Sequence, residues 1–265
     1  MKISCLVITT TIKERFHLLC NAIDSIERCN DESVLDQKVL SIDIVEGQPY
    51  RRRDFEKFEK MGWHLAKGPC SGSHGMANNM HRGLAYIDGD ILFYCEDDVI
   101  IQKIPTRKNL DLMFYNTRPF GAIVYNTHAD NTLEKEGTES RLNYINDTSK
   151  YFGDGDDTFL LKGEPIKDEY WICFPAAIMK TDHFRSCLSY ACKNCLEMGM
   201  EPGMTKAWFD LGFGSEPVAM YVQRDILNDF PVDFQKLHDR ANMQFWNNDV
   251  NLRHESVNER QNTIF

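Results

Sequence analysis

Three consecutive carboxylates, Glu96, Asp97 and Asp98, follow a short apolar run at residues 91–95. So apolar a run predicts a buried strand, and the Asp-Gly-Asp before it predicts a turn that leads into the strand. Acids at the end of a buried strand repel one another and lose hydration unless a positive group lies among them. A divalent cation with oxygen ligands meets that need. The alternative is a strand followed by an acidic, solvated turn.

The first hundred residues alternate predicted strands and helices. The strands lie at 3–10, 38–46 and 63–66 and from 91 to the acids, and the helices lie at 13–28, 54–61 and 75–87. This order predicts an α/β fold with a mostly parallel, Rossmann-like central sheet flanked by helices. Ligands of such sheets bind outside the carboxyl ends of the strands, where the acids would lie.

The second half of the chain is less regular. Residues 105–165 are predicted to be irregular, with one strand at 121–125. Further strands are predicted at 170–179 and 217–222, and helices at 181–198 and 202–211. From 225 onward the chain is polar and reads as a tail with one or two helices.

Composition limits the classes of function. The 265 residues are 42% hydrophobic, enough to bury one proper core, and the formal net charge of −10 disfavours long-range attraction to nucleic acid or anionic membranes. Residues 51–53 form the only dense basic cluster. No segment approaches the roughly 18 apolar residues of a membrane span. The apolar start is too brief for a signal peptide, so we expect a cytoplasmic protein.

The cysteines predict no metal cluster. There are nine of them, an odd number with irregular spacing, and several lie inside apolar runs. Cys192 and Cys195 form a Cys-x-x-Cys pair, but a zinc site needs a second such pair or two histidines at ligand spacing. These residues are therefore interpreted as structural thiols.

Four segments together resemble the metal-dependent nucleotide-sugar glycosyltransferases of the A-type fold (GT-A), most closely the large family 2. The first strand ends in Thr9-Thr10-Thr11, and 75–84 matches the family's Gly-rich approach and Asn-containing helix. That helix runs into the strand that ends in 96–98, the place of the family's Asp-x-Asp motif. Finally, 198–214 is similar to the family's later acidic motif and the segment after it.

The resemblance implies a Mn²⁺ or Mg²⁺ ion and a nucleotide-diphosphate sugar as donor. Glu96 and Asp98 would hold the ion, which neutralises the leaving diphosphate as a Lewis acid. Glu96 stands where the family usually has Asp, so the choice of ligands among the three acids stays open, and Asp97 is an alternative contact for the ribose or sugar. A third ligand would come from the C-terminal part, with His238 as first candidate and His254 as second.

The threonines at the end of the first strand, Thr9, Thr10 and Thr11, would meet the base or ribose. Alternatively they end the strand and cap the following helix. Glu46, after the second strand, would accept hydrogen bonds from the base or ribose, with Asp43 as the other choice.

Asn79 and Arg82 lie three residues apart, hence on one helix face. Arg82 would reach a phosphate or the sugar, unless it is a solvated helix arginine. The resemblance further implies inversion at the anomeric carbon, with Glu201 as the base that deprotonates the acceptor hydroxyl. Asp210 is the second choice for this base, and Trp208 is interpreted as core.

We therefore expect a GT-A-like catalytic domain over 1–224, with a nucleotide-sugar-binding half at 1–104 and an acceptor-binding half at 105–224. Residues 225–265 would be a C-terminal extension near the active site. The expected function is glycosyl transfer to an acceptor hydroxyl of a glycan, a protein or, less favoured, a modified DNA base. The alternatives are a sugar nucleotidyltransferase and a non-catalytic nucleotide-sugar-binding protein of the same fold.

Overall fold

The computed structural model describes residues 1–30, 33–70, 75–101, 103–115, 119–126, 144–145, 158–161, 176–216 and 218–222. The candidate ligand His238 and the expected extension at 225–265 lie outside these residues. None of the helices in the described ranges has the length and apolar character that crossing a bilayer requires.

The first half of the chain alternates strands and helices as its sequence predicts. The elements are β1 (Ile3–Thr10), α1 (Arg15–Cys29), β2 (Gln37–Ile44), α2 (Arg52–Lys60), β3 (His64–Pro69), α3 (Gly75–Leu84) and β4 (Ile91–Glu96). Strands β2 and β4 both pair parallel with β1, and β3 pairs parallel with β2. Together they form the parallel half of the sheet.

The second half adds shorter strands and three further α-helices within the described residues. Its elements are α4 (Arg107–Phe114), β5 (Ala122–Asn126), β6 (Tyr144–Ile145), β7 (Thr158–Leu161), β8 (Ala176–Lys180), α7 (Thr181–Asn194), η3 (Leu196–Met198), α8 (Met200–Asp210), η4 (Phe213–Ser215) and β9 (Val218–Val222). Strand β8 runs antiparallel to both β4 and β5, so this half of the sheet is mixed. The predicted α/β class is confirmed, with the antiparallel strands confined to the second half.

The strand order places a topological switch point in the sheet. The order is β3-β2-β1-β4-β8-β5-β9-β7-β6, so the chain moves outward from β1 to β3 and then crosses to the other side of β1 to form β4. In open α/β sheets, the crevice that binds ligands lies outside the carboxyl ends of the strands at such a point, here the ends of β1 and β4. Ile8 is paired with Glu96 in the register, so the ends of β1 and β4 lie at the same level.

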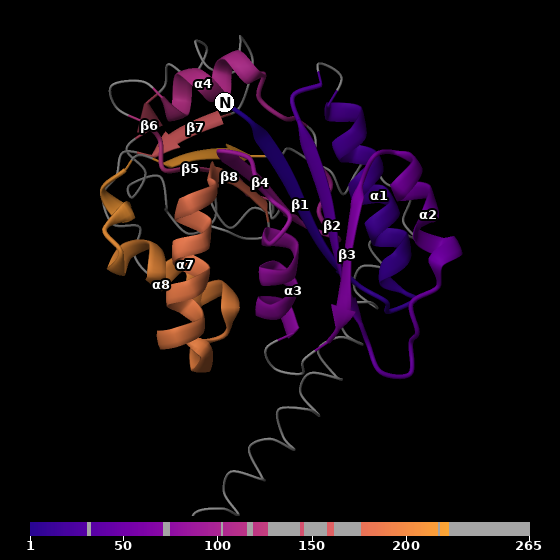
Figure 1. The fold of residues 1–265 in the computed structure, drawn as a ribbon. Coiled ribbons are helices and arrows are strands. Elements are labelled where there is room, and N and C mark those ends of the chain that lie inside the picture. Colours follow the sequence, from indigo (N-terminus) through magenta and orange to yellow (C-terminus); the bar gives the residue numbers. More distant parts are fainter. Residues whose placement is uncertain are drawn as a thin grey trace, which may run out of the picture.

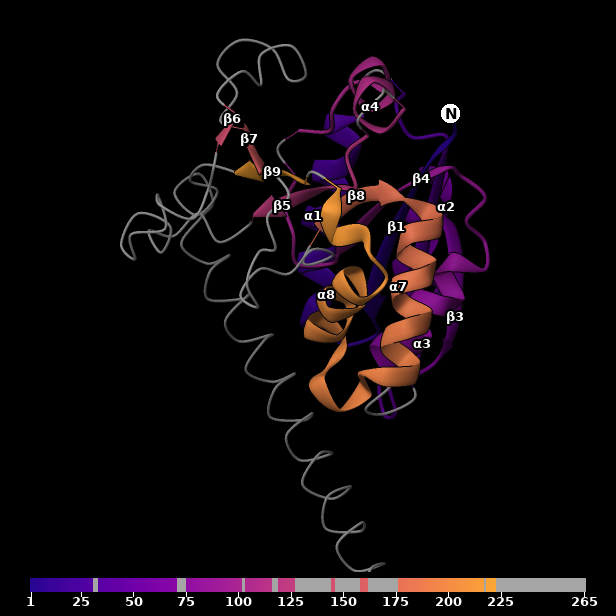
Figure 2. The same cartoon turned by 90° about the vertical axis from the view of Figure 1, so that its left-hand side faces the viewer.

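Helices cover both faces of the sheet and divide the core into two layers (Figure 1). Leu19 and Ile23 of α1 and Phe58 of α2 pack on one face. Met80 of α3 and Leu188 of α7 pack on the other. Figure 2 shows α7 and α8 side by side, and α8 adds the fully buried Trp208 to the second layer, as predicted for that residue.

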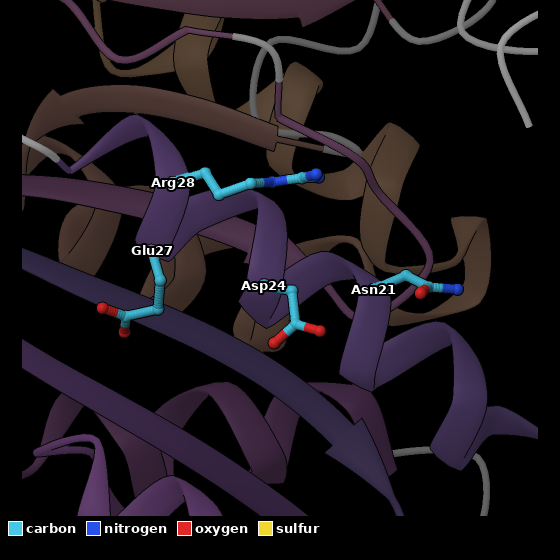
Figure 3. A pocket seen from close by; sticks show the side chains of 4 residues that line it. All are labelled: Asn21, Asp24, Glu27 and Arg28. Carbon is cyan, nitrogen blue, oxygen red and sulfur yellow. The ribbon is translucent and has the colours of Figure 1, made fainter.

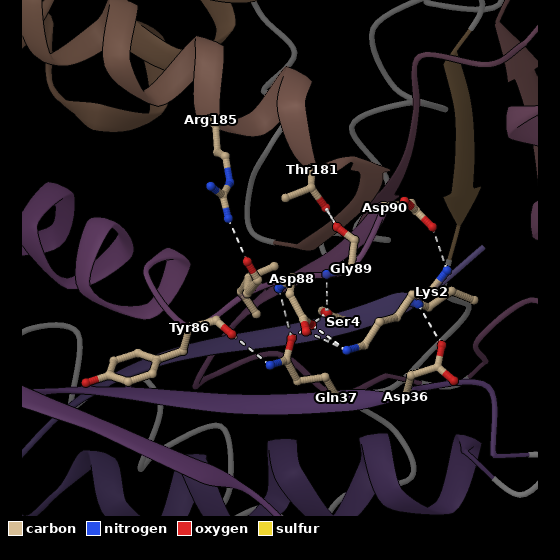
Figure 4. Close-up of polar contacts among 12 residues, drawn as sticks. Lys2, Ser4, Asp36, Gln37, Tyr86, Asp88, Gly89, Asp90, Thr181 and Arg185 are labelled. Atoms are coloured by element: carbon tan, nitrogen blue, oxygen red, sulfur yellow. Dashed lines mark hydrogen bonds and ion pairs between the residues drawn. The ribbon is translucent and has the colours of Figure 1, made fainter.

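The amino ends of β1 and β4 are tied together by a polar network (Figure 4). The Ser4 hydroxyl accepts a hydrogen bond from the Gly89 amide at 3.1 Å, and a Cβ at Gly89 would lie 2.4 Å from the same oxygen. Thr181, at the start of α7, donates to the Gly89 carbonyl at 2.6 Å. Asp90 accepts from the Lys2 amide at 2.7 Å. These contacts set the register of β4 and hence the position of its acidic end.

Helix α4 was not predicted, because residues 105–165 read as irregular. Two local signals mark it. Thr106 caps the helix, its hydroxyl accepting from the Asn109 amide at 3.3 Å. Leu110, Met113 and Phe114 are buried at helical spacing. The helix is short, and its apolar stripe gains most of its stability from the sheet face on which it packs rather than from intrinsic propensity.

Candidate functional site

The acids that follow β4 lie at the switch point. Glu96 is the last residue of β4 and is half-buried, Asp97 is only 1% exposed, and Asp98 is half-buried. Glu201, in the first turn of α8, is also half-buried and is close enough to raise the pKa of Glu96. A strand end and a helix start that are about a hundred residues apart in the chain thus bring their carboxylates together.

Asp97 is held by protein groups on both of its oxygens. The Thr9 hydroxyl donates to Oδ2 at 2.6 Å, and Arg15 Nε donates to both oxygens at 3.1 Å. Arg15 Nη2 also pairs with Asp97. Burial raises the pKa of Asp97, and the Arg15 guanidinium opposes that shift. The structure therefore uses Asp97 as an anchor between β1, α1 and the acidic turn, and does not favour it as a contact for ribose or sugar.

Glu96, Asp98 and Glu201 form a group of carboxylates that repel one another. Burial raises the pKa of Glu96 well above its usual value, and the charges of Asp98 and Glu201 add to this shift. Burial, and then the charge of Asp98, raise the pKa of Glu201 to about 7. Shifts of this kind, from burial plus a specific charged neighbour in a crevice, are typical of functional sites.

The chemistry of this group fits a divalent cation. Glu96 Oε1 is buried and has no hydrogen-bond partner among the described residues. An orphaned carboxylate oxygen facing like charges gains most from a cation. Within the described ranges, no set of three or more His, Cys, Asp or Glu side chains is arranged to hold a metal by itself. Mg²⁺ and Mn²⁺ sites for phosphate substrates need only one or two carboxylates, because phosphate oxygens and waters supply the rest.

The three threonines make local contacts at the end of β1. Thr9 donates to Asp97 and is 2% exposed. The Thr10 hydroxyl accepts from the Ile12 amide at 3.3 Å, as a turn-capping residue does. Thr11 is hydrogen-bonded to the loop after β2, accepting from the Val45 amide at 2.9 Å. Thr10 and Thr11 are half-buried at the crevice, whereas Thr9 is removed from it.

Asn79 links α3 to the end of β1. Its side-chain amide donates to the Thr9 carbonyl at 2.9 Å, and its own carbonyl accepts from Ser41 at 2.8 Å. With 2% exposure, Asn79 is a packing and orienting residue. It holds α3 beside the end of β1.

Arg82 and Asp43 form an ion pair at the edge of the sheet. Arg82 Nη1 lies 2.8 Å from Asp43 Oδ1, and Nη2 donates to the Pro69 carbonyl at 3.2 Å. The guanidinium thus joins the ends of β2 and β3 rather than facing solvent. Burial raises the pKa of Asp43, and Arg82 opposes that shift. Glu46, the other acid considered for the base or ribose, is exposed in the turn after β2.

Asp210 is separated from Glu201 by the length of α8. Nine residues of α-helix rise about 13 Å. At its end of the helix, Asp210 accepts from the Tyr190 hydroxyl and from Lys206, each at 2.7 Å. These bonds hold its pKa below the ordinary value, Lys206 having the larger effect. Asp210 and Glu201 therefore do not form one site.

Arg15 is the site residue that sequence analysis missed. Beyond its bonds to Asp97, Arg15 Nη2 lies 3.2 Å from Asp98 Oδ2. It is 8% exposed at the first position of α1, where a positive charge opposes the helix dipole. A positive charge at the start of a predicted helix is unfavourable, and this feature of the sequence could have identified Arg15. Its engagement by carboxylates also counts against a phosphate-binding loop after β1, which the nucleotidyltransferase alternative requires.

A hollow on the surface of α1 has none of these acids among its described lining residues (Figure 3). It is lined by Asn21, Asp24, Glu27 and Arg28, all from one helix. Glu27 is used structurally, because it accepts from Lys38 at 2.8 Å and from the Trp63 indole at 2.6 Å. None of the predicted site residues within the described ranges lines this hollow.

Comparison with known proteins gives likeness at the level of solved structures. No protein-family model and no curated protein sequence matches the chain. The 4-diphosphocytidyl-2C-methyl-D-erythritol synthase of Anaerococcus prevotii is 13% identical, with a TM-score of 0.46 over 92% of this chain and 98% of that one. Glucosyl-3-phosphoglycerate synthase of Mycobacterium tuberculosis, solved with Mn²⁺, UDP and glucosyl-3-phosphoglycerate, is 13% identical, with a TM-score of 0.46 over 86% and 74%.

S. aureus TarS, residues 1–349, is 12% identical, with a TM-score of 0.40 over 85% of this chain and 58% of that one. The structures found thus include GT-A-type glycosyltransferases and a nucleotidyltransferase. Identities of this size concern the arrangement of strands and helices alone. They say nothing of the substrate or the reaction of this chain.

Proposed function

We propose that this chain is a metal-dependent glycosyltransferase that uses a nucleotide-diphosphate sugar. The observation that carries the proposal is the convergence of Glu96, Asp98 and Glu201 at the switch point, with Glu96 Oε1 lacking a partner among the described residues. Binding of a cation and a diphosphate at the carboxyl ends of β1 and β4 is the use of such a crevice that physical chemistry favours.

Glu96 and Asp98 would hold Mn²⁺ or Mg²⁺, and Asp97 would not be a ligand. When bound, the ion supplies Lewis-acid stabilisation of the charge that develops on the leaving diphosphate. The half-buried Thr10 and Thr11, at the end of β1, would lie next to the ribose of the donor. The buried Asn79 and the ion-paired Arg82 would support these residues from α3.

Glu201 would act as the base. As the acceptor oxygen attacks the anomeric carbon, Glu201 takes the hydroxyl proton, the bond from carbon to the diphosphate oxygen breaks, and the nucleoside diphosphate leaves with the electron pair. A base works best when its pKa is near the operating pH, and the pKa of Glu201 is about 7. Direct displacement of this kind inverts the anomeric centre.

A thermal-shift panel tests the proposal. UDP-, GDP- and dTDP-sugars and their parent nucleotides are each added with Mn²⁺ or with EDTA. A ligand that binds only the native state raises the free energy of unfolding by RT ln(1 + [L]/Kd), about 2.7 kcal/mol at a hundredfold excess over Kd, and so raises the melting temperature. We expect a shift that needs Mn²⁺ for one nucleotide. Equal shifts with EDTA and with Mn²⁺ would refute the metal site, and binding without donor hydrolysis or transfer would favour a non-catalytic binding protein.

A further inference from the structure

We propose that Arg15 is a positioning residue of the metal site, whose guanidinium bridges Asp97 and Asp98 and thereby orients the Asp98 carboxylate toward the cation. This inference rests on the proposed function. The inference goes beyond the proposed function by assigning distinct roles to two neighbouring acids and by adding a residue from a different element. The bridge joins the start of α1 to the turn after β4.

The contacts of Asp97 and Asp98 with Arg15 give the two acids different roles. Both Asp97 oxygens accept from Arg15 Nε at 3.1 Å, and Thr9 completes the set from β1. Asp98 meets the same guanidinium through a contact of 3.2 Å from Nη2 to Oδ2. Asp97 is therefore the buried partner that fixes the guanidinium plane. Asp98, more exposed, is the acid that the fixed plane orients.

The position of Arg15 is energetically unfavourable, and local structure does not offset this cost. An arginine in the first turn of a helix opposes the helix dipole, and burying its guanidinium removes hydration. The ion pair with Asp97 compensates for burying the guanidinium. That pair does not require the further contact between Arg15 Nη2 and Asp98. A planar fork with several donors can serve two carboxylates at once, and an ammonium group cannot do so with the same geometry. The need for a two-carboxylate bridge explains why arginine stands here.

Outer residues that orient metal ligands affect affinity strongly, and their loss typically lowers metal affinity by 10- to 100-fold. Removing the positive charge of Arg15 would by itself strengthen attraction for a cation, since the remaining site becomes more negative. Loss of the orienting contact is therefore expected to weaken Mn²⁺ binding, whereas loss of the positive charge is expected to strengthen it. A substitution that preserves charge isolates the orienting role.

The test measures the affinity for Mn²⁺ alone, from the electron paramagnetic resonance signal of the free ion. Arg15→Lys keeps the charge, and we expect about tenfold weaker Mn²⁺ binding. The matched control is Arg107→Lys, because Arg107 makes a similar two-atom pair with Asp36, at 3.0 and 2.8 Å, away from the site. The control should bind Mn²⁺ as the wild type does. Wild-type affinity in a folded Arg15→Lys protein would overturn the proposal.

A second variant decides the question if Arg15→Lys melts below the assay temperature. Arg15→Met combined with Asp97→Asn removes one charge of each sign, so the net charge of the site is unchanged and no unpaired buried ion remains. We again expect about tenfold weaker Mn²⁺ binding, with a melting temperature in EDTA close to that of the wild type. Unchanged affinity would show that Arg15 only stabilises the fold. Absence of Mn²⁺ binding in the wild type would instead refute the metal site of the proposed function itself.

Discussion

Asp97 and Asp98 are neighbours in the chain and have the same functional group, yet their surroundings give them different roles. Asp97 is 1% exposed and is bound by Thr9 and Arg15, whereas Asp98 contributes to the raised pKa values of Glu96 and Glu201. Because a carboxylate with both oxygens engaged has little capacity left for a ligand, the proposed division between an anchor, Asp97, and a metal ligand, Asp98, follows from burial. Residue type alone does not distinguish the two acids.

Asp98→Asn should remove metal binding while leaving the fold intact. The change is isosteric, and relief of the repulsion among three carboxylates offsets the loss of the ion pair with Arg15, so the melting temperature in EDTA should stay close to that of the wild type. Mn²⁺ affinity should fall roughly 100-fold or more, since a lost ligand matters at least as much as a lost orienting group. Free-ion spectroscopy measures the affinity. Asp88→Asn, which alters an exposed acid paired with Lys2, is the control. Retained Mn²⁺ binding in Asp98→Asn would show that Asp98 is not a ligand.

Glu201→Gln should separate binding from transfer. The amide keeps the shape of the side chain but cannot accept a proton, so kcat should fall by about 10²- to 10⁴-fold. The Mn²⁺-dependent thermal shift with the donor should persist. Glu197→Gln, which changes an exposed acid in the preceding η3, should leave kcat unchanged. A Glu201→Gln enzyme with normal kcat would rule out Glu201 as the base.

At the scale of elements, α3 positions the crevice by packing unusually close to the sheet. A Cβ at Gly83 would lie 2.3 Å from Leu6 Cδ1 and 3.1 Å from the Ser41 Cβ. The Leu6 methyl group is able to move, but the Ser41 Cβ is fixed to its strand. This close approach lets Asn79, one turn earlier, reach the Thr9 carbonyl. The glycine is thus needed for distance and not for backbone conformation.

Gly83→Ala should destabilise the protein by about 1–3 kcal/mol, because the added methyl group overpacks the contact between α3 and β2. It should also weaken donor binding if α3 shifts outward. Urea unfolding measures the first effect and the Mn²⁺-dependent thermal shift the second. Asn78→Ala lies on the exposed face of the same helix and should be neutral or slightly stabilising. A fully stable Gly83→Ala variant would mean that α3 is less tightly seated than its contacts indicate.

At the scale of the whole molecule, the carboxylate cluster makes global stability depend on pH. The pKa of Glu201 is about 7 in the folded state against an ordinary value of 4.5. Between these values the folded state binds more protons than the unfolded state. The free energy of unfolding should therefore fall as the pH rises from about 4.5 to about 7, and remain lower above that range. The raised pKa of Glu96 acts in the same direction.

We expect the wild type in EDTA to lose on the order of 1–3 kcal/mol between pH 5 and pH 8 through Glu201. Urea unfolding at the two pH values measures it. Glu201→Gln should lose less stability over the same interval, since the contribution of Glu201 is then absent. The same loss in both proteins would show that Glu201 titrates normally in the folded state.

Much of the architecture was predictable because hydrophobic periodicity is a local property. The predicted strand at 3–10 agrees with β1, and the alternation through β4 follows from short apolar runs separated by amphipathic helices. The acidic end of β4 was likewise visible, because strand ends have local signals, whereas α8 begins at Met200, before the predicted start at 202, and so includes Glu201 in its first turn. Helix α4 escaped because its short apolar stripe lies in polar surroundings.

The sequence by itself determined the α/β class, the position of the acids at the end of a buried strand and the set of residues that could bind or transfer protons. Only the tertiary structure decided which of them meet. It brought Arg15 to the acids, committed Asp97 and Arg82 to protein partners and separated Asp210 from Glu201. The physical reason is that a side chain's role depends on burial and on partners from distant elements, and the chain order of residues contains neither directly.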